Sequence, residues 1–88
     1  MVSEKLTVVN KLGFHMRPAS RFVQAMAKYK SDIHILYNGK DVDGKSILIL
    51  MAAGIKCGAA IELRCDGPDE EAMLKEAAAL VRSGLGEE

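Results

Sequence analysis

The chain has few aromatic residues and no excess of charge of either sign. Only 5% of its 88 residues are aromatic, and tryptophan is absent. The 12 Lys and Arg residues are balanced by 12 Asp and Glu residues, so the formal net charge is zero. Nucleic-acid-binding domains usually carry a basic face, and single-strand binders stack bases on aromatic side chains. We therefore expect no nucleic-acid partner.

Cysteines are also scarce, and long apolar runs are absent. Cys57 and Cys65 form no CxxC motif and have no second ligand pair or nearby histidine. We therefore expect no metal site, no cofactor and reduced thiols, as in a cytoplasmic protein. The longest apolar run, Ile47 to Gly54, is too short to span a bilayer. The N-terminus lacks the apolar core of a secretion signal, so neither secretion nor a membrane partner is expected.

The length of the chain suits a single domain over residues 1–88. A chain this short buries about 60–65% of the surface that its unfolded form exposes. Such a domain has no large cleft of its own. This disfavours an enzyme that encloses its substrate, and we expect a protein that is not an enzyme.

The hydrophobic periodicity predicts the order strand, helix, strand, strand, helix, strand, helix. The predicted strands are 5–9, 32–37, 40–42 and 60–65, and the predicted helices run from about 16 to 27, over 47–53, and from about 69 to 84. The dipeptide Asn38-Gly39 is a strong signal for a hairpin turn. We expect an α+β open-faced sandwich (βαββαβα), in which three helices cover one face of a four-stranded antiparallel sheet.

The stretch around His15 carries the most chemical information. Pro18 suits the first turn of a helix, so His15 is expected at the N-cap. Helix N-termini bind phosphate, and the planar guanidinium of Arg17 suits the same anion. The helix dipole and Arg17 both disfavour a protonated ring, which keeps the imidazole neutral and nucleophilic. These residues alone leave a second interpretation open, in which His15 only caps the helix.

The stretch Gly13-Phe14-His15-Met16-Arg17-Pro18-Ala19 resembles the signature Gly-[Leu/Ile]-His-Ala-Arg-Pro-Ala of the HPr family. These proteins are the histidine-containing phosphocarriers of the bacterial phosphoenolpyruvate-dependent sugar phosphotransferase system. The preceding Asn10-Lys11-Leu12 is also similar to many members. A second region, between Lys45 and Leu63, resembles the family's regulatory-serine segment and the strand after it. The resemblance covers almost the whole chain.

The resemblance implies the partners and the roles of three residues. His15 would accept a phosphoryl group on Nδ1 from enzyme I and pass it to IIA domains of sugar permeases, while Arg17 holds that group. Ser46 would be phosphorylated by an HPr kinase/phosphorylase, with a transcriptional regulator as a further partner. The chain is expected to be a monomer. A relative from the nitrogen-regulatory branch would carry the same His15, so the branch stays open.

The chain departs from the family pattern in its apolar residues near the signature. Phe14 and Met16 replace smaller side chains, and the run from Ile47 to Met51 is heavier than usual. A short helix that is apolar all round cannot bury every side against one sheet. We therefore expect a partly exposed partner-binding surface beside His15, formed by Phe14, Met16, Ile47, Leu48 and Met51; the alternative is that the run belongs to the core.

Two other functions compete with phosphoryl carriage. Residues 39–46 match the Walker A pattern GxxxxGK[ST] and would make the chain a nucleotide-binding enzyme. Against this, Asp41 and Asp43 place negative charge where a phosphate would bind, and Asn38-Gly39 is better used as a hairpin turn. Ser46 is expected to be a helix N-cap whether or not it is phosphorylated. The third hypothesis is a plain interaction module. His34 alternates with inward-facing isoleucines and is expected to be an exposed strand residue without chemistry.

Overall fold

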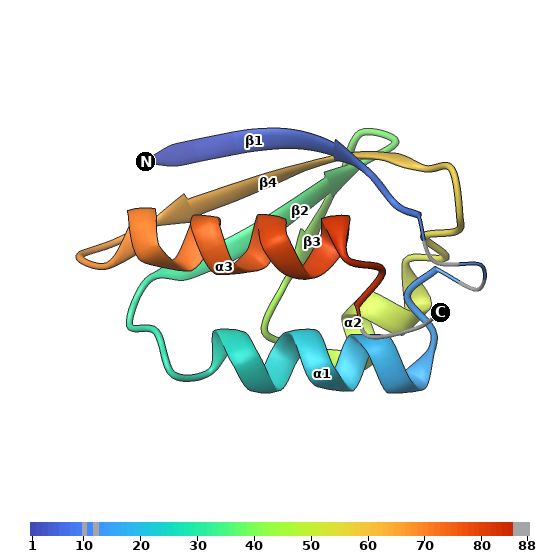
Figure 1. The fold of residues 1–88 in the computed structure, drawn as a ribbon, viewed down its shortest axis with the longest axis horizontal. Coiled ribbons are helices and arrows are strands. Elements are labelled where there is room, and N and C mark those ends of the chain that lie inside the picture. Colours follow the sequence, from blue (N-terminus) through green and yellow to red (C-terminus); the bar gives the residue numbers. More distant parts are fainter. Residues whose placement is uncertain (10, 12, 86–88) are drawn as a thin grey trace.

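In the computed structural model, which describes residues 1–9, 11 and 13–85, the elements follow one another in the predicted order. They are β1 (Val2–Thr7), α1 (Met16–Met26), β2 (Asp32–Tyr37), β3 (Lys40–Asp43), α2 (Ile47–Ala52), β4 (Ala60–Asp66) and α3 (Glu70–Arg82). The strands are ordered β1-β4-β2-β3, and each neighbouring pair is antiparallel. The helices lie on one side of the sheet (Figure 1). The predicted open-faced sandwich is confirmed.

The core lies between the sheet and the helices. On the inner face of the two central strands, Ile33 pairs with Cys65 and Ile35 pairs with Leu63. All four side chains are buried, because alternate residues of a strand point to the same face. The helices contribute further large buried side chains, among them Phe22 and Met26 from α1, Leu50 from α2, and Met73 and Val81 from α3.

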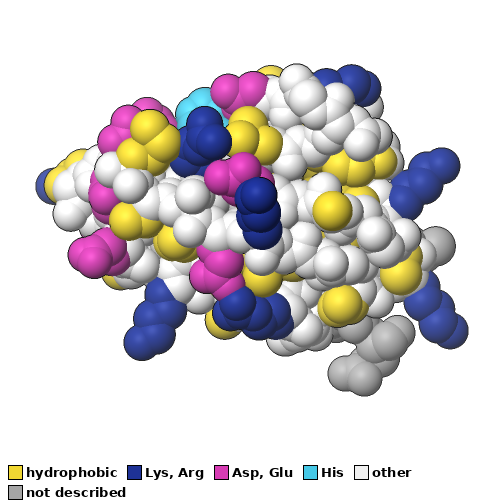
Figure 2. All heavy atoms as spheres, turned by 90° about the horizontal axis from the view of Figure 1, so that it is seen from above, with side chains coloured by type: hydrophobic (Ala, Val, Ile, Leu, Met, Phe, Trp, Pro, Cys, Tyr) yellow, Lys and Arg dark blue, Asp and Glu magenta, His cyan; other side chains and the backbone are white. Residues whose placement is uncertain are grey.

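The outer face of the sheet carries charged side chains of both signs, with hydrophobic side chains between them (Figure 2). His34 lies on this face, is half-buried, and has its Nδ1 atom 2.7 Å from Oδ1 of Asp41 on β3. The sequence prediction of an outward-facing strand residue is confirmed for His34. Its partner is a carboxylate of the neighbouring strand, far from the helix layer.

The first strand begins three residues earlier than predicted. Val2 and Ser3 already pair with β4, and the regular strand ends at Thr7. The alternation of apolar and polar residues is interrupted at Glu4, a charged residue at an inward position of an edge strand, where it forms an ion pair with Arg82 of α3. Val8 is buried beyond the strand, where its N–H donates to the carbonyl of Ala59 at 3.0 Å.

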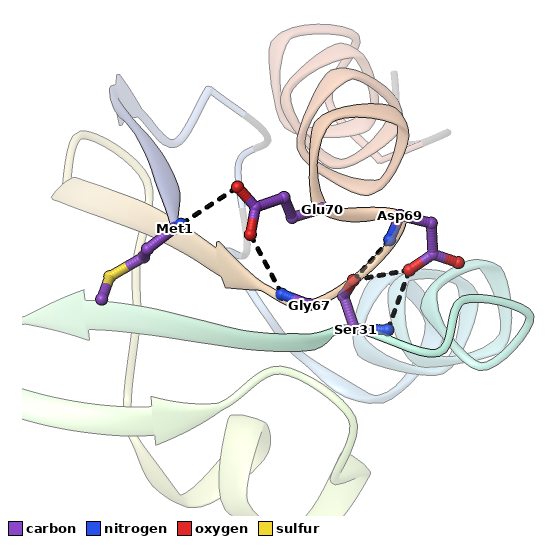
Figure 3. A network of polar contacts seen from close by, with 5 residues as sticks. All are labelled: Met1, Ser31, Gly67, Asp69 and Glu70. Carbon is purple, nitrogen blue, oxygen red and sulfur yellow. Dashed lines mark hydrogen bonds and ion pairs between the residues drawn. The ribbon is translucent and has the colours of Figure 1, made fainter.

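A polar network joins the start of α3 to the turn before β2 (Figure 3). Asp69, expected in the first turn of the helix, is instead its N-cap, and its carboxylate accepts no capping bond from the helix. It accepts hydrogen bonds from the N–H groups of Lys30 and Ser31 and, at 2.5 Å, from the hydroxyl of Ser31. These bonds lower the pKa of Asp69 to about 2. A Cβ on Gly67 would lie 2.5 Å from the Ser31 hydroxyl, so the close approach requires glycine.

Candidate functional site

His15 occupies the N-cap of α1, as predicted. Its backbone is extended (φ −87°, ψ −170°), and its carbonyl accepts the first helical hydrogen bond from the N–H of Ala19 at 3.0 Å. The side chain makes no capping hydrogen bond to the helix. The interpretation of His15 as only a helix cap therefore lacks the contact that defines such a cap. The half-buried imidazole stands at the end of the helix where anions are favoured.

The loop before His15 is fixed by contacts with the loop after α2. The N–H of Phe14 donates to the carbonyl of Ile55 at 3.0 Å. Gly13 has a φ of +63°, and a Cβ there would lie 2.1 Å from that carbonyl oxygen, so the approach is open only to glycine. Asn10 and Leu12, which carried part of the family resemblance, lie outside the described residues.

The expectation that Phe14 is partly exposed is wrong. Its side chain is only 3% exposed and packs edge-on against Phe22, with ring centroids 5.6 Å apart and planes at 86°. Such an aromatic pair stabilises the buried position beyond its apolar area. Phe14 therefore anchors the loop that carries His15 and contributes no exposed surface.

A shallow hollow lies beside the imidazole at the first two turns of α1. It is lined by His15, Met16, Arg17, Ser20 and Arg21. The first turn of α1 contains no acidic residue, and the side chain of Arg17 is exposed there. Backbone N–H groups of a first helical turn lack intrahelical acceptors, and together with an arginine they favour a phosphate. The hollow thus brings an imidazole together with groups that favour an anion.

Helix α2, which packs against α1, exposes part of its apolar run. Ser46 is its N-cap, and the hydroxyl accepts a hydrogen bond from the N–H of Ile49 at 3.3 Å, as predicted. Leu48 is 80% exposed, whereas Leu50 is fully buried in the core. Helices α1 and α2 pack against each other. The run is thus divided between core and surface. Ile49 and Met51 are exposed like Leu48, and Ile47 is half-buried. On α1, Met16 is exposed as well.

The Walker A match does not form a phosphate-binding loop. Asn38 and Gly39 have φ values of 50° and 75° and form the turn of the β2–β3 hairpin. Residues 40–43 are the antiparallel strand β3, whereas a P-loop joins a strand to a following helix across a glycine-rich turn. The ammonium of Lys45 donates to the carbonyl of Tyr29 at 2.9 Å, near the end of α1. The nucleotide-binding hypothesis is therefore rejected.

Within residues 1–9, 11 and 13–85, no three His, Cys, Asp or Glu side chains are grouped so that they could hold a metal ion. Over the same ranges, each helix is too short or too polar to cross a bilayer. Cys57 is exposed and Cys65 is buried, and both thiols are free. Burial raises the pKa of the Cys65 thiol to about 11, so it is a poor nucleophile.

Two exposed residues of this region were missed by sequence reasoning. Arg21 follows Arg17 by one helical turn and lines the same hollow, and the spacing of four residues was the available signal. Ile49 is 46% exposed beside Leu48. It was missed because the contiguous apolar run of α2 does not show which side faces the sheet.

Comparison with known proteins gives consistent matches over the length of the chain. Residues 2–83 match the family described as "PTS HPr component phosphorylation site". Phosphocarrier protein HPr of Neisseria meningitidis serogroup A is 34% identical over 87 residues, which cover 99% of this chain and 98% of that protein. The crystal structure of HPr-C-His from Thermoanaerobacter tengcongensis superimposes with a TM-score of 0.95 at 38% identity, covering 100% of this chain and 99% of that one. The Bacillus subtilis protein Crh, solved as a domain-swapped dimer, has a TM-score of 0.77 at 37% identity, with 96% and 97% covered.

Proposed function

Because the chain belongs to the HPr family of phosphocarriers of the phosphotransferase system, we propose that His15 accepts a phosphoryl group from enzyme I and passes it to IIA domains of sugar permeases. The protein is a carrier of the phosphoryl group and not an enzyme. In this proposal residues 1–88 act as one domain. The observation that carries it is the half-buried imidazole of His15 at the N-terminus of α1, in a hollow that it shares with Arg17.

The proposed transfer is a substitution at phosphorus. The lone pair of the neutral imidazole, on Nδ1 by family resemblance, forms a bond to phosphorus while the bond between phosphorus and its donor breaks. The donor keeps that electron pair. In the second transfer His15 is the leaving group, and a nucleophile on the IIA domain takes the phosphoryl group. A neutral ring is required for the first step, because a protonated imidazole has no lone pair to offer on that nitrogen.

Arg17 and the start of α1 would stabilise the phosphorylated ring. A phosphoryl group on His15 brings negative charge to the end of the helix that carries partial positive charge. Arg17 lies in the first turn of that helix, and its guanidinium offers two parallel N–H donors to phosphate oxygens. The same groups favour arrival of the phosphoryl group and hold it until the next partner docks.

The partner surface would be the exposed apolar residues beside the hollow. Met16 is 66% exposed and Leu48 is 80% exposed. Large exposed apolar side chains that cluster on a small domain mark a surface for another protein. Met51, Ile49 and the exposed part of Ile47 extend it along α2. This surface, Met16 with Ile47, Leu48, Ile49 and Met51, is called the docking patch below.

Ser46 would regulate docking when a kinase/phosphorylase is present, with a transcriptional regulator as a further partner. The support is the family resemblance together with its position, half-buried at the N-cap of α2 directly before the docking patch. A phosphoserine carries about −1.5 to −2 charge at pH 7. Such a charge next to side chains that a partner must desolvate would weaken docking while leaving the fold intact.

The protein would work in the cytoplasm as a monomer. The hollow and the docking patch belong to a single copy of the chain, so transfer needs no second copy. The swapped dimer is a property reported for Crh. Size-exclusion chromatography with light scattering, measured across protein concentration, tests the monomer; a concentration-independent dimer would contradict it.

The direct test of carriage uses purified enzyme I, phosphoenolpyruvate and an isolated IIA domain. The expected result is rapid labelling of the chain, followed by loss of its phosphate when the IIA domain is added. The Arg17→Lys variant is measured beside the unchanged chain. His34→Ala is the control, since His34 lies on the outer face of the sheet. A chain that accepts phosphate but never delivers it to any IIA domain would contradict the sugar-branch proposal.

A further inference from the structure

The ring of Phe22 supports the loop that carries His15. Phe22 belongs to α1 and is fully buried. Its ring packs edge-on against Phe14, the residue directly before His15, with ring centroids 5.6 Å apart. Neither ring lines the hollow. Because an aromatic pair of this kind has a defined geometry, the position of the Phe22 ring bears on the position of Phe14, and so on that of the next residue, His15.

A second segment of the chain limits the position of the same ring. Gly44 lies in the turn between β3 and α2, and a Cβ at this position would be 3.3 Å from Cε1 of Phe22. It would also be 2.8 Å from Cγ2 of Ile33 and 3.1 Å from the carbonyl oxygen of Ile33. Gly44 is buried, and its N–H donates to that carbonyl at 2.9 Å. The turn is thus tied to β2 close to the Phe22 ring.

The space around Gly44, and not its backbone conformation, explains why a glycine stands there. Gly39 in the preceding hairpin turn has a φ of +75°, whereas the φ of Gly44 is not positive, so another residue could adopt the same backbone conformation. Ile33 cannot give way easily, because its side chain is β-branched and its backbone pairs with β4. The Phe22 ring is therefore the neighbour that an added methyl group would displace.

We propose that Phe22 and Gly44 are positioning residues for His15, Phe22 because it supports Phe14 and Gly44 because it leaves room for the Phe22 ring; this rests on the proposed function. Phe14 is larger than the Leu or Ile of the family signature, so the core beside it has to accommodate a second ring. A reacting atom misplaced by about 1 Å can lower a rate about a hundredfold. Both positioning residues act through Phe14, without contact to the phosphoryl group.

The test is a double-mutant cycle that measures phosphorylation of the chain by enzyme I. Gly44→Ala adds one methyl group against the Phe22 ring. It should lower kcat about three- to tenfold and leave KM nearly unchanged, because the exposed side chains of the docking patch stay the same. In the Phe14→Leu background the ring has room to move toward the smaller side chain. There the same Gly44→Ala change should alter kcat by less than about twofold.

The NMR signals of the His15 ring test the position of the imidazole without any partner. They should shift in Gly44→Ala and also in Phe22→Leu, which removes the supporting ring and adds no volume. Met73→Ala is the control, because Met73 is fully buried in the first turn of α3. The start of α3 and the start of α1 lie at opposite ends of the helix layer (Figure 1). Met73→Ala should lower the thermal midpoint at least as much as Gly44→Ala, with unchanged kcat and unchanged His15 signals.

Several outcomes would overturn the inference. The first is a kcat of Gly44→Ala equal to that of the unchanged chain, and the second is a loss of kcat that persists in full in the Phe14→Leu background. A raised KM with unchanged kcat would place the effect of Gly44 on α2 and the docking patch instead. An equal loss of kcat in Met73→Ala would make it an effect of stability alone. If Gly44→Ala does not fold, kcat, KM and the His15 signals of Phe22→Leu decide by the same criteria.

Failure of the proposed function would be seen separately. An unchanged chain that gains no phosphate from enzyme I would contradict phosphoryl carriage. The NMR signals of the His15 ring in Gly44→Ala and Phe22→Leu would still show whether these two residues set the position of the imidazole.

Discussion

At the scale of the residue, the placement of His15 depends on the backbone geometry of the residues just before and just after it in the chain. Before it, Gly13 permits the close approach of Ile55, and the N–H of Phe14 bonds to the Ile55 carbonyl. After it, α1 begins at once with Met16. The imidazole thus lies at the positive end of a helix, where a phosphoryl group would be stabilised.

Arg17→Lys should slow phosphorylation of His15 by about tenfold or more while the fold survives. Lysine keeps the charge and loses the two parallel donors that match phosphate oxygens. Arg17 is exposed, so its replacement leaves the core unchanged. Stopped-flow or quenched-flow transfer rates from enzyme I measure the effect, with the thermal midpoint as a control. Equal transfer rates for both proteins would remove Arg17 from the set of phosphate ligands.

At this scale, the positions of residues in their elements were easier to predict from the sequence than the burial of their side chains. His15, Arg17 and the N-cap Ser46 lie where motif and capping preferences place them. Phe14 was misplaced because the family signature shows only that the position is apolar. Its burial depends on the Phe22 ring, eight residues later on the inner face of α1, and that contact exists only after the helix has packed.

At the scale of the element, α2 serves the core and the surface at once. Leu50 reaches the core, while Leu48 and Ile49 face solvent within the same six-residue helix. The contiguous run of apolar residues has no period of its own, so sequence alone could not divide it. Packing against α1 and β3 decides which side is buried.

Leu48→Glu should weaken binding to enzyme I by about tenfold and leave the thermal midpoint nearly unchanged, because the side chain is 80% exposed. The matched variant is Leu50→Ala, two residues away and fully buried, which should cost about 2–5 kcal/mol of stability. Isothermal titration calorimetry and thermal unfolding measure the two effects. Comparable destabilisation by both changes would show that Leu48 belongs to the core.

Ser46→Asp should slow phosphorylation of His15 by enzyme I with little change in stability. Aspartate is a good N-cap, so the hydrogen bond now made to Ile49 is replaced, and its negative charge lies beside the docking patch. Ser46→Ala is the control that removes the cap without adding charge, and it should lose about 1 kcal/mol of stability with normal transfer. Unfolding of Ser46→Asp would instead make Ser46 a structural residue whose hydroxyl is required.

Asp69 should make the stability of the protein depend on acid pH. Its folded-state pKa of about 2 lies below the ordinary value of 3.8, because the Ser31 hydroxyl and backbone N–H groups bond the carboxylate. Its contribution is therefore fully present above about pH 4 and is lost as the pH falls toward 2. Asp69→Asn should have a lower thermal midpoint than the unchanged protein at neutral pH. This difference in thermal midpoint should become smaller as the pH falls from 4 to 2.

The control for this pH profile is Asp66→Asn, an exposed carboxylate at the end of β4. It should retain the acid profile of the unchanged protein. If the difference in thermal midpoint between Asp69→Asn and the unchanged protein stays constant down to pH 2, the charge of the carboxylate contributes nothing to the stability of the protein.

At the scale of the whole molecule, the fold brings three distant segments to one place. The loop before α1, the loop after α2 and the turn after α3 meet around the start of α1 through the Phe14–Ile55 and Arg21–Leu85 contacts. The hollow, the docking patch and Ser46 therefore belong to neighbouring parts of one helix layer, as Figure 1 shows for α1 and α2. A single partner surface can cover all of them.

The layer architecture was predictable because its strands alternate and its helices have turn and cap signals. Asp32–Tyr37 was predicted with correct bounds, since Ile33 and Ile35 alternate with polar residues and Asn38-Gly39 closes the hairpin. Contacts between residues far apart in sequence were not predictable. The bond from Asp69 to Ser31 spans 38 residues and that from Arg21 to Leu85 spans 64, and no local pattern marks either pair.

The central claim is that His15 carries the phosphoryl group, and intact-mass measurement tests it most directly. The unchanged chain, His15→Ala and His34→Ala are incubated with phosphoenolpyruvate and enzyme I, then measured at neutral pH and after acidification. The account predicts one phosphoryl group on the unchanged chain and on His34→Ala, lost in acid because a phosphorus–nitrogen bond is acid-labile, and none on His15→Ala. A phosphoryl group that remains on His15→Ala, or one that survives acid on the unchanged chain, would contradict the account.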